Sequence, residues 1–259
     1  MRPALALTAT TRENQGDMTA LAASLPLAGL PVRFRAGLTA ALAAGLAYLL
    51  LSPLLDGTAN VVLKGSGVTL LALSALQLRT DGARWLAAIM ALGALGDVLL
   101  ALPGLFIAGA ASFAAGHLVA IIFYARHRSA AGARDWLMAA LLLLFGLAMP
   151  PLLTPAGLPF GQTLLYAVLL SAMAASLWLS RFPRLAALGA IAFVLSDTIL
   201  VLRLGGGRLI GPTVDGAMVW AFYFGGQWLI ALGVGRGASS AFRAQAAGQR
   251  ARAVALVRR

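Results

Sequence analysis

Eight apolar stretches, each close to the length that crosses a bilayer, dominate the sequence. A transmembrane helix needs about 20 mainly apolar residues. Only 11% of the 259 residues are charged, against about 25% in soluble domains. We therefore predict an all-α fold, a polytopic membrane helix bundle of about eight transmembrane helices. The stretches lie at approximately 36–52, 59–78, 85–102, 105–125, 136–153, 161–180, 184–203 and 216–235.

Turn-forming residues mark the breaks between these stretches, which supports the same division of the chain. Several stretches are also rich in alanine and glycine, and small residues of this kind allow membrane helices to pack closely. We therefore expect short loops and close helix contacts. The turn signals are Ser52-Pro53, Asp56-Gly57, Thr80-Asp81-Gly82, Pro103-Gly104, Pro150-Pro151 and Gly205-Gly206-Gly207.

Basic residues are distributed unevenly between the two ends of the predicted helices. With the N-terminus inside, 17 arginines fall in cytoplasmic segments and only Arg203 and Arg208 on the opposite side. Because basic residues accumulate on the cytoplasmic side, we expect both termini in the cytoplasm. The alanine-rich and arginine-rich composition suggests the inner (cell) membrane of a bacterium. The net charge of +12 is then explained by the arginines that lie on the cytoplasmic side and contact anionic membrane lipids. We expect no nucleic-acid partner.

Three segments follow from this pattern. Residues 1–35 are expected to form a disordered cytoplasmic tail, in which Met18 is an alternative start. Residues 36–235 form the eight-helix transmembrane domain. Residues 236–259 form a basic cytoplasmic tail, either an exposed helix or a disordered segment. Cysteine is absent, which excludes disulfides and thiolate chemistry.

An internal repeat is visible in the third and seventh spans. The segment from Gly93 to Leu100, which contains Leu95-Gly96-Asp97, corresponds to the segment from Phe193 to Leu200, which contains Leu195-Ser196-Asp197. Four spans separate the two copies, so a parallel 4+4 repeat would give both halves one orientation. Chance similarity between apolar helices is the alternative. If the repeat exists, Asp97 and Asp197 face each other across it.

Four ionisable residues lie inside predicted spans, where a charge costs at least a few kcal/mol and therefore marks a candidate functional site. Lys64, the only lysine, lies near the start of the second span. Asp97 and Asp197 lie roughly 20 Å from the cytoplasmic ends of their helices, and His117 lies slightly deeper in the fourth span. We predict that these side chains meet in the outer half of the membrane.

Three further polar residues belong to the predicted site. Tyr223 and Gln227 are one turn apart on the last span and so share a face, while Ser196 precedes Asp197. A purely structural lysine–aspartate ion pair is the alternative reading of the cluster. Trp220 is predicted to anchor the outer interface. A metal site at Asp97, His117 and Asp197 is not expected, because no ligand spacing supports it and Lys64 would compete.

Two carboxyl groups in an apolar pocket suit acid-catalysed hydrolysis. Burial and mutual repulsion favour protonation of one, while a nearby cation keeps the other ionised. One carboxyl group can then donate a proton while the other stabilises a developing cation or activates water.

Several of these motifs occur together in one family. Lys64, Leu95-Gly96-Asp97, Ser112-Phe113 through Gly116-His117, Leu195-Ser196-Asp197 and Tyr223-Phe224 with Gln227 resemble the YhhN/TMEM86 family over roughly residues 36–235. The family's lysine is typically followed by proline, whereas Gly65 follows Lys64 here, which loosens the backbone at this point.

The resemblance implies an eight-helix lysoplasmalogenase, which hydrolyses the vinyl-ether bond of a lysophospholipid to a fatty aldehyde and a glycerophospho-headgroup. It implies catalytic roles for Asp97, Asp197, His117 and Tyr223, supporting or substrate-binding roles for Lys64, Gln227 and Ser196, no cofactor, and a lipid substrate that enters from the bilayer. The alternative is a membrane transporter or lipid-binding protein that uses the same cluster as a proton or substrate site. The sequence carries no signal for an oligomeric state.

Overall fold

The computed structural model describes residues 27, 29–154 and 159–257. Within these ranges the chain forms eight helices that are long and apolar enough to cross a membrane, and no strand occurs there. The predicted fold class is therefore confirmed. The helices are α2 (Val32–Leu51), α3 (Gly57–Ala75), α4 (Gly82–Leu100), α5 (Phe106–Arg126), α6 (Ala133–Leu153), α7 (Phe160–Trp178), α8 (Arg184–Leu204) and α9 (Pro212–Val257), with a short 3₁₀ turn, η1 (Ser52–Leu54), after α2.

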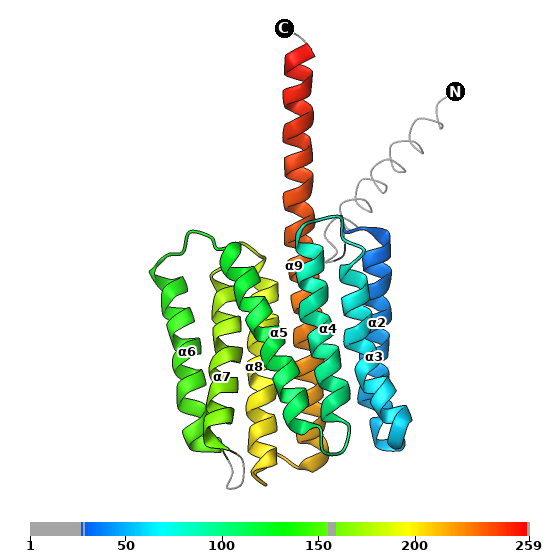
Figure 1. The fold of residues 1–259 in the computed structure, drawn as a ribbon, viewed down its shortest axis with the longest axis vertical. Coiled ribbons are helices and arrows are strands. Elements are labelled where there is room, and N and C mark those ends of the chain that lie inside the picture. Colours follow the sequence, from blue (N-terminus) through cyan, green and yellow to red (C-terminus); the bar gives the residue numbers. More distant parts are fainter. Residues whose placement is uncertain (1–26, 28, 155–158, 258–259) are drawn as a thin grey trace, which may run out of the picture.

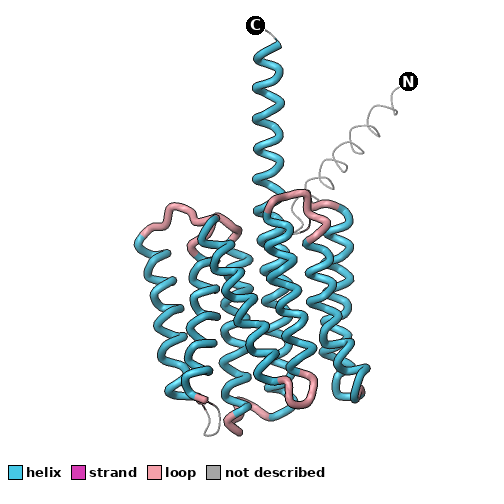
Figure 2. Tube along the Cα trace, in the orientation of Figure 1, coloured by secondary structure: helices cyan, strands magenta, loops and turns pink. Residues whose placement is uncertain are grey.

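Loops lie only at the two ends of the bundle in the described segments (Figure 2). Most of the predicted turn residues lie in these loops or at the helix ends beside them, where they adopt conformations that other residues disfavour. The exception is Pro150-Pro151, which lies inside the last part of α6. Gly57, Gly104 and Gly206 have φ values of 55°, 77° and 77°, in the left-handed region that glycine enters at little cost. Pro159 and Pro183 precede the first residues of α7 and α8.

The helices are arranged around α9, which packs against α8, α2, α3 and α4. Neighbouring helices also pair along the chain from α2 to α5 and from α6 to α8, and α5 packs against α7. Helix α6 contacts mainly α7 and lies at the edge (Figure 1). Glycines permit the closest contact, between α8 and α9. A Cβ added to Gly189 would lie 2.6 Å from the carbonyl oxygen of Gly226, so a larger residue at this crossing would force the backbones apart.

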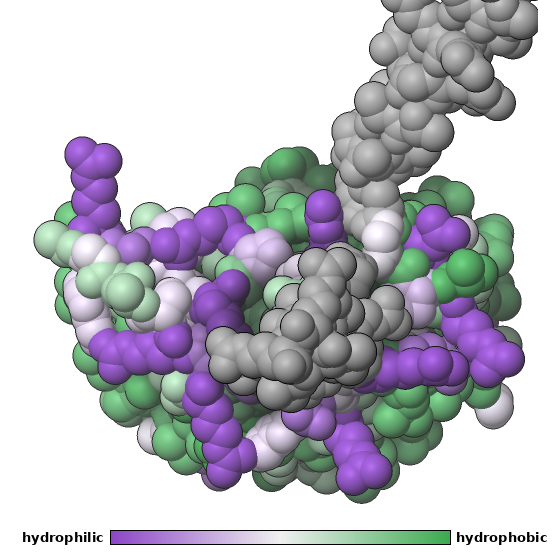
Figure 3. All heavy atoms as spheres, turned by 90° about the horizontal axis from the view of Figure 1, so that it is seen from above, coloured by the Kyte–Doolittle hydropathy of each residue, from purple (hydrophilic) through white to green (hydrophobic). Residues whose placement is uncertain are grey.

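Helix α9 is longer than the predicted span. It continues without a break from Pro212 to Val257 over 46 residues and projects from one end of the bundle (Figure 1). The bundle face from which it projects is called the arginine-rich face below. Hydrophilic side chains gather around this face, and apolar side chains cover the flanks (Figure 3). Arginines of the described loops and helix ends at this face are Arg33, Arg35, Arg79, Arg84, Arg126, Arg128, Arg134, Arg181, Arg184 and Arg236.

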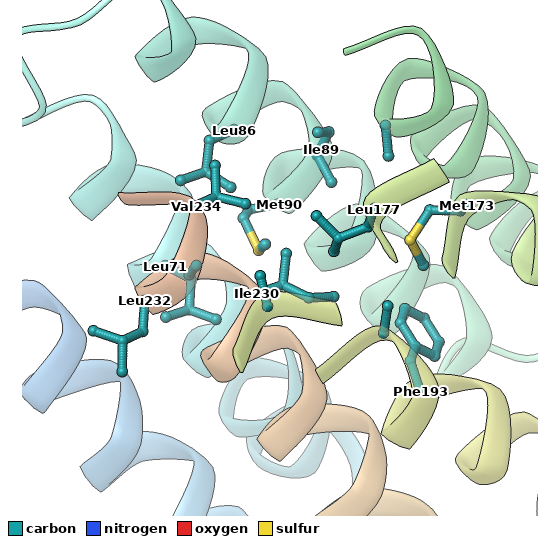
Figure 4. Close-up of a cluster of buried hydrophobic side chains, with 14 of the residues drawn as sticks. Leu71, Leu86, Ile89, Met90, Met173, Leu177, Phe193, Ile230, Leu232 and Val234 are labelled. Carbon is teal, nitrogen blue, oxygen red and sulfur yellow. The ribbon is translucent and has the colours of Figure 1, made fainter. Parts of the chain in front are cut away.

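The apolar core fills the half of the bundle next to the arginine-rich face. Side chains from α4, α7 and α9, among them Met90, Leu177 and Ile230, converge there (Figure 4). Each of these three is at most 2% exposed. Such close packing closes this half of the bundle, so the polar residues of the other half are accessible only from the opposite end or from the bilayer.

Candidate active site

A cavity of about 610 Å³ occupies the half of the bundle away from the arginine-rich face. Its lining reaches Ser52 and Pro53 after α2 and Pro212 at the start of α9, so it extends to the helix ends at this side. Seven helices contribute side chains to it. These include Tyr48 from α2, Lys64 from α3, Asp97 from α4, Phe113 from α5, Tyr166 from α7, Asp197 from α8 and Tyr223 from α9.

The two predicted aspartates line this single cavity, and each is held by a tyrosine. Asp97 is 1% exposed and Asp197 is 7% exposed. The Tyr223 hydroxyl donates a hydrogen bond of 2.7 Å to Oδ2 of Asp97, and the Tyr166 hydroxyl donates one of 2.8 Å to Oδ2 of Asp197. Each phenol therefore fixes one oxygen of its carboxyl group and orients the other.

Aromatic rings surround the aspartates. The ring centroid of Phe193 lies 5.0 Å from that of Tyr223, and that of Phe113 lies 5.7 Å from it. On the other side, Trp220 lies 5.6 Å from Tyr223 and 4.2 Å from Tyr48. All five rings line the cavity, so their π-electron faces and edges form much of its wall.

Lys64 lines the cavity and is half-buried. The lysine–aspartate ion pair of the alternative, purely structural reading is absent from the described residues, in which the one salt bridge joins Arg184 to Asp135 at the arginine-rich face. Asn60, one turn before Lys64 on α3, also lines the cavity, and its Oδ1 atom is buried with no hydrogen-bond partner. A buried polar atom without a partner is costly, so Asn60 is suited to contact a ligand.

Ser196 lines the cavity, but its hydroxyl is already engaged. It donates a hydrogen bond of 2.9 Å to the carbonyl oxygen of Val219 on α9. This bond fastens α8 to α9 next to Asp197, so the geometry gives Ser196 a supporting position.

His117 and Gln227 do not line the main cavity. They border a small internal void of about 10 Å³ on the far side of Phe113 and Phe193, which line both spaces. His117 is 4% exposed, its ring centroid lies 5.6 Å from that of Tyr166, and its Nε2 atom has no hydrogen-bond partner. Both residues therefore stand behind the aromatic wall, in contact with residues that hold the aspartates rather than with the cavity itself.

A second, mainly apolar pocket of about 100 Å³ adjoins the main cavity between α4, α5, α7 and α8. Asp197, Tyr166 and Phe113 line both spaces, whereas Asp97 lines only the larger one. Asp197 is therefore at the junction between the main cavity, which carries the charged side chains, and a smaller pocket whose lining is almost entirely apolar. The apolar lining includes Leu100, Phe106, Ile107, Ala110, Leu200, Val201 and Leu204.

A family model described as the YhhN family matches residues 59–234. The chain belongs to the YhhN family. No curated protein and no solved structure matches it. In this YhhN family member the matched segment runs from the first turn of α3 into α9 and contains both aspartates with the tyrosines that hold them.

The cavity residues of this YhhN protein that were not predicted from the sequence include Tyr48, Asn60, Tyr166 and Arg203. Asn60 carries a sequence signal, because it lies four residues before Lys64 and therefore on the same helix face. The predicted role of Trp220 as an interface anchor is wrong. Its side chain is 6% exposed, and its indole nitrogen donates a hydrogen bond of 2.9 Å to the carbonyl oxygen of Gly45, because the cavity wall needs a ring at this position.

The arrangement is suited to proton transfer in a confined, largely apolar space. Two carboxyl groups, three phenols, one ammonium group and one guanidinium group share the main cavity. No group of three or more His, Cys, Asp or Glu side chains that could hold a metal occurs in the part of the chain that the structure describes. The available chemistry is that of carboxyl groups acting as proton donor and acceptor, which typically contributes about 10²-fold to 10⁴-fold in rate.

Proposed function

We propose that this protein is an intramembrane hydrolase that cleaves the vinyl-ether bond of lysoplasmalogen-type lysophospholipids to a fatty aldehyde and a glycerophospho-headgroup. The observation that supports it most is the position of Asp197. This aspartate lines both the main cavity, which carries the charged side chains, and the apolar pocket, while Asp97 lines the main cavity alone. In a lysoplasmalogen, the vinyl-ether bond that is cleaved lies between the apolar chain and the polar headgroup, so it would fit at this junction.

The proposed reaction begins with Asp197 as the acid. With the chain in the apolar pocket, the protonated carboxyl group of Asp197 transfers its proton to the chain-side carbon of the double bond. The π electrons form the new C–H bond, and the carbon attached to the ether oxygen becomes an oxocarbenium centre. An ionised Asp97 accepts a proton from water as the water oxygen attacks that centre, which gives a hemiacetal.

The second half of the reaction restores both aspartates. The hemiacetal hydroxyl returns its proton to Asp197 as the aldehyde C=O bond forms. The bond from the same carbon to the ether oxygen breaks, and that oxygen takes the proton held by Asp97. One water is consumed, the fatty aldehyde and the headgroup alcohol are released, and no cofactor is required.

The aromatic wall favours this mechanism over a reaction through an anion. Ring faces attract a nearby cation by about 0.5–2 kcal/mol each, and more strongly when the cation is desolvated. Phe113, Phe193 and Tyr223 are clustered next to the aspartates. An oxocarbenium centre formed between the two carboxyl groups would therefore lie near ring electrons as well as near the carboxylate of Asp97.

A membrane transporter or lipid-binding protein is the second candidate function, with the same cluster as a proton or substrate site. The observation that favours it is the one-sided cavity, closed by the apolar core toward the arginine-rich face. Alternating access also begins from a cavity open to one side. A protein of this kind would bind or move lysolipid and form no aldehyde.

The discriminating experiment measures aldehyde release from a lysoplasmalogen by purified protein in detergent over a broad pH range. We expect Asp97→Asn and Asp197→Asn each to lower kcat by about 10²-fold to 10⁴-fold. Asp81→Asn is the matched control, because Asp81 is exposed before α4 at the arginine-rich face. No aldehyde at any pH rejects the hydrolase. Aldehyde release that both cavity variants retain rejects the paired-aspartate mechanism.

A further inference from the structure

Two cations line the main cavity and form no salt bridge in the described part of the chain. They are Lys64 on α3 and Arg203 in the last turn of α8. Lys64 lies within electrostatic range of Asp97, and Arg203 lies within that of Asp215. The one salt bridge among the described residues joins Arg184 to Asp135 at the arginine-rich face. Both cations are therefore available to an anionic ligand inside the cavity.

Arg203 is held in place by the start of α9. Its Nη2 atom donates a hydrogen bond of 3.4 Å to the carbonyl oxygen of Pro212. A Cβ added to Gly216 would lie 3.4 Å from the same nitrogen, so the guanidinium group rests against the first turn of α9. This contact uses one of the five N–H donors of arginine and leaves the others for a ligand.

Asp215, the first acidic residue after Arg203 in the sequence, is held by backbone amides. The carboxylate oxygens of the buried Asp215 accept hydrogen bonds from the backbone amides of Leu209, Ile210 and Gly211, at 3.0, 3.0 and 3.4 Å. Asp215 therefore shapes the α8–α9 loop and does not form a salt bridge with Arg203.

We infer that Lys64 and Arg203 form an anion subsite for the phosphate group of a lysolipid headgroup, with Asn60 as a hydrogen-bond partner for a headgroup hydroxyl. Arginine binds phosphate through paired N–H donors, and lysine adds a compact charge. The unpartnered Oδ1 of Asn60 is an independent sign that a polar group belongs beside Lys64. The inference rests on the proposed function for the identity of the lipid.

The spacing along α8 agrees with this assignment. Arg203 is six residues beyond Asp197 toward the open end, which corresponds to about 9 Å along the helix axis. In a lysoplasmalogen, about seven bonds separate the phosphorus from the carbon that is protonated. At about 1.2 Å per bond, an extended chain of these atoms spans about 8 Å. A lipid with its phosphate at Arg203 can therefore place its double bond at Asp197.

Binding of an uncleavable lipid tests the subsite separately from catalysis. A saturated 1-O-alkyl lysophospholipid is compared with the matching 1-O-alkylglycerol, which lacks the phosphate, by calorimetry on the full chain in detergent. We expect the phospholipid to bind at least about 10-fold more tightly than the alkylglycerol, because its phosphate can accept hydrogen bonds from the two cations. Arg203→Gln and Lys64→Gln should each reduce this preference about 5-fold or more.

Arg208→Gln is the matched control, because Arg208 is exposed at the same end of the bundle and does not line the cavity. It should leave the preference unchanged. Arg203→Lys keeps the positive charge and should therefore retain part of the preference for the phospholipid. It serves as the test variant if Arg203→Gln does not fold. Equal affinity for the two wild-type ligands, or equal losses in Arg208→Gln and Arg203→Gln, would overturn the subsite.

Inorganic phosphate distinguishes the two sources of the anion. We expect millimolar phosphate to displace little lysophospholipid, because the chain contributes to binding in the apolar pocket. Phosphate binding as tight as that of the lipid would overturn the headgroup assignment. A protein that prefers the phospholipid but releases no aldehyde would retain the subsite and reject only the hydrolase, so the two proposals fail separately.

Discussion

Tyr166 on α7 and Asp197 on α8 are joined by a hydrogen bond of 2.8 Å between the phenol and Oδ2. Tyr223 and Asp97 are joined in the same way at 2.7 Å. In both pairs the tyrosine and the aspartate come from different helices, so each bond couples helix packing to the position of a reactive group.

The phenols should stabilise the fold as well as orient the aspartates. Tyr166→Phe and Tyr223→Phe leave a buried carboxyl group without its donor, which typically costs about 1–3 kcal/mol. We expect both variants to have a lower Tm in detergent and a lower kcat with the lysoplasmalogen substrate.

Tyr124→Phe provides the control for these two variants. The Tyr124 hydroxyl is buried but has no hydrogen-bond partner, so its removal should leave the Tm unchanged or raise it. An equal loss of stability in all three phenylalanine variants would show that the hydrogen bonds to the aspartates contribute nothing specific.

The apolar pocket should set the preference for chain length. Ala110 lines this pocket, and Ala110→Phe would fill much of it. Each methylene that can no longer be buried forfeits about 0.8 kcal/mol. We expect kcat/KM to fall by about 10-fold or more for long-chain substrates and by much less for short-chain ones, in a comparison of substrates with one headgroup.

Ala111→Phe is the neighbouring control, since Ala111 is exposed on the flank of α5. It should leave the chain-length profile unchanged. A profile that shifts equally in both variants would argue against the pocket as the chain site.

The crossing of α8 and α9 should be highly sensitive to side-chain size. A Cβ on Gly226 would lie 2.5 Å from the carbonyl oxygen of Gly189, whereas a Cβ on Gly225 would meet nothing within 4 Å. Overpacking of this kind costs about 1–3 kcal/mol. We expect Gly226→Ala to lower the Tm in detergent and Gly225→Ala to leave it near the wild-type value. Equal Tm values would contradict the close approach of the two helices.

Membrane orientation can be measured directly because the chain contains no cysteine. Ala130→Cys introduces an exposed thiol in the α5–α6 loop at the arginine-rich face, and Ala59→Cys introduces one in the first turn of α3 at the opposite end. The positive-inside rule predicts that an impermeant maleimide labels Ala59→Cys in intact cells. Ala130→Cys should react only after the membrane is permeabilised, and the reverse pattern would invert the topology.

Hydropathy was sufficient to predict the eight helices, because each crosses the bundle once and carries a long apolar run. Proline and glycine mark only some of the breaks, since α3 and α5 end without either residue. Hydropathy was not sufficient for the length of α9. Its last turns are rich in alanine and arginine, which continue a helix without an apolar signal. The 4+4 repeat and the outer-membrane-half position of the site stay predictions.

The sequence places four polar residues at similar depths along their helices, and in the structure all four line one cavity: Lys64, Asp97, Asp197 and Tyr223. Depth does not specify which way a helix is rotated or which helices are neighbours. For that reason Tyr166 was missed although it holds Asp197. Depth also does not show that His117 and Gln227 lie behind Phe113 and Phe193, which separate them from the cavity. Their roles in the site stay predictions.

The closed apolar half of the bundle has a consequence for lipid sidedness. Met90, Leu177 and Ile230 fill the half beside the arginine-rich face, so a headgroup can reach the aspartates only from the other end. With the orientation that the arginines predict, the protein would draw lysolipid from the outer leaflet alone. Its two products would then separate by phase: the aldehyde would stay in the bilayer, and the water-soluble headgroup would leave on the side opposite to the cytoplasm.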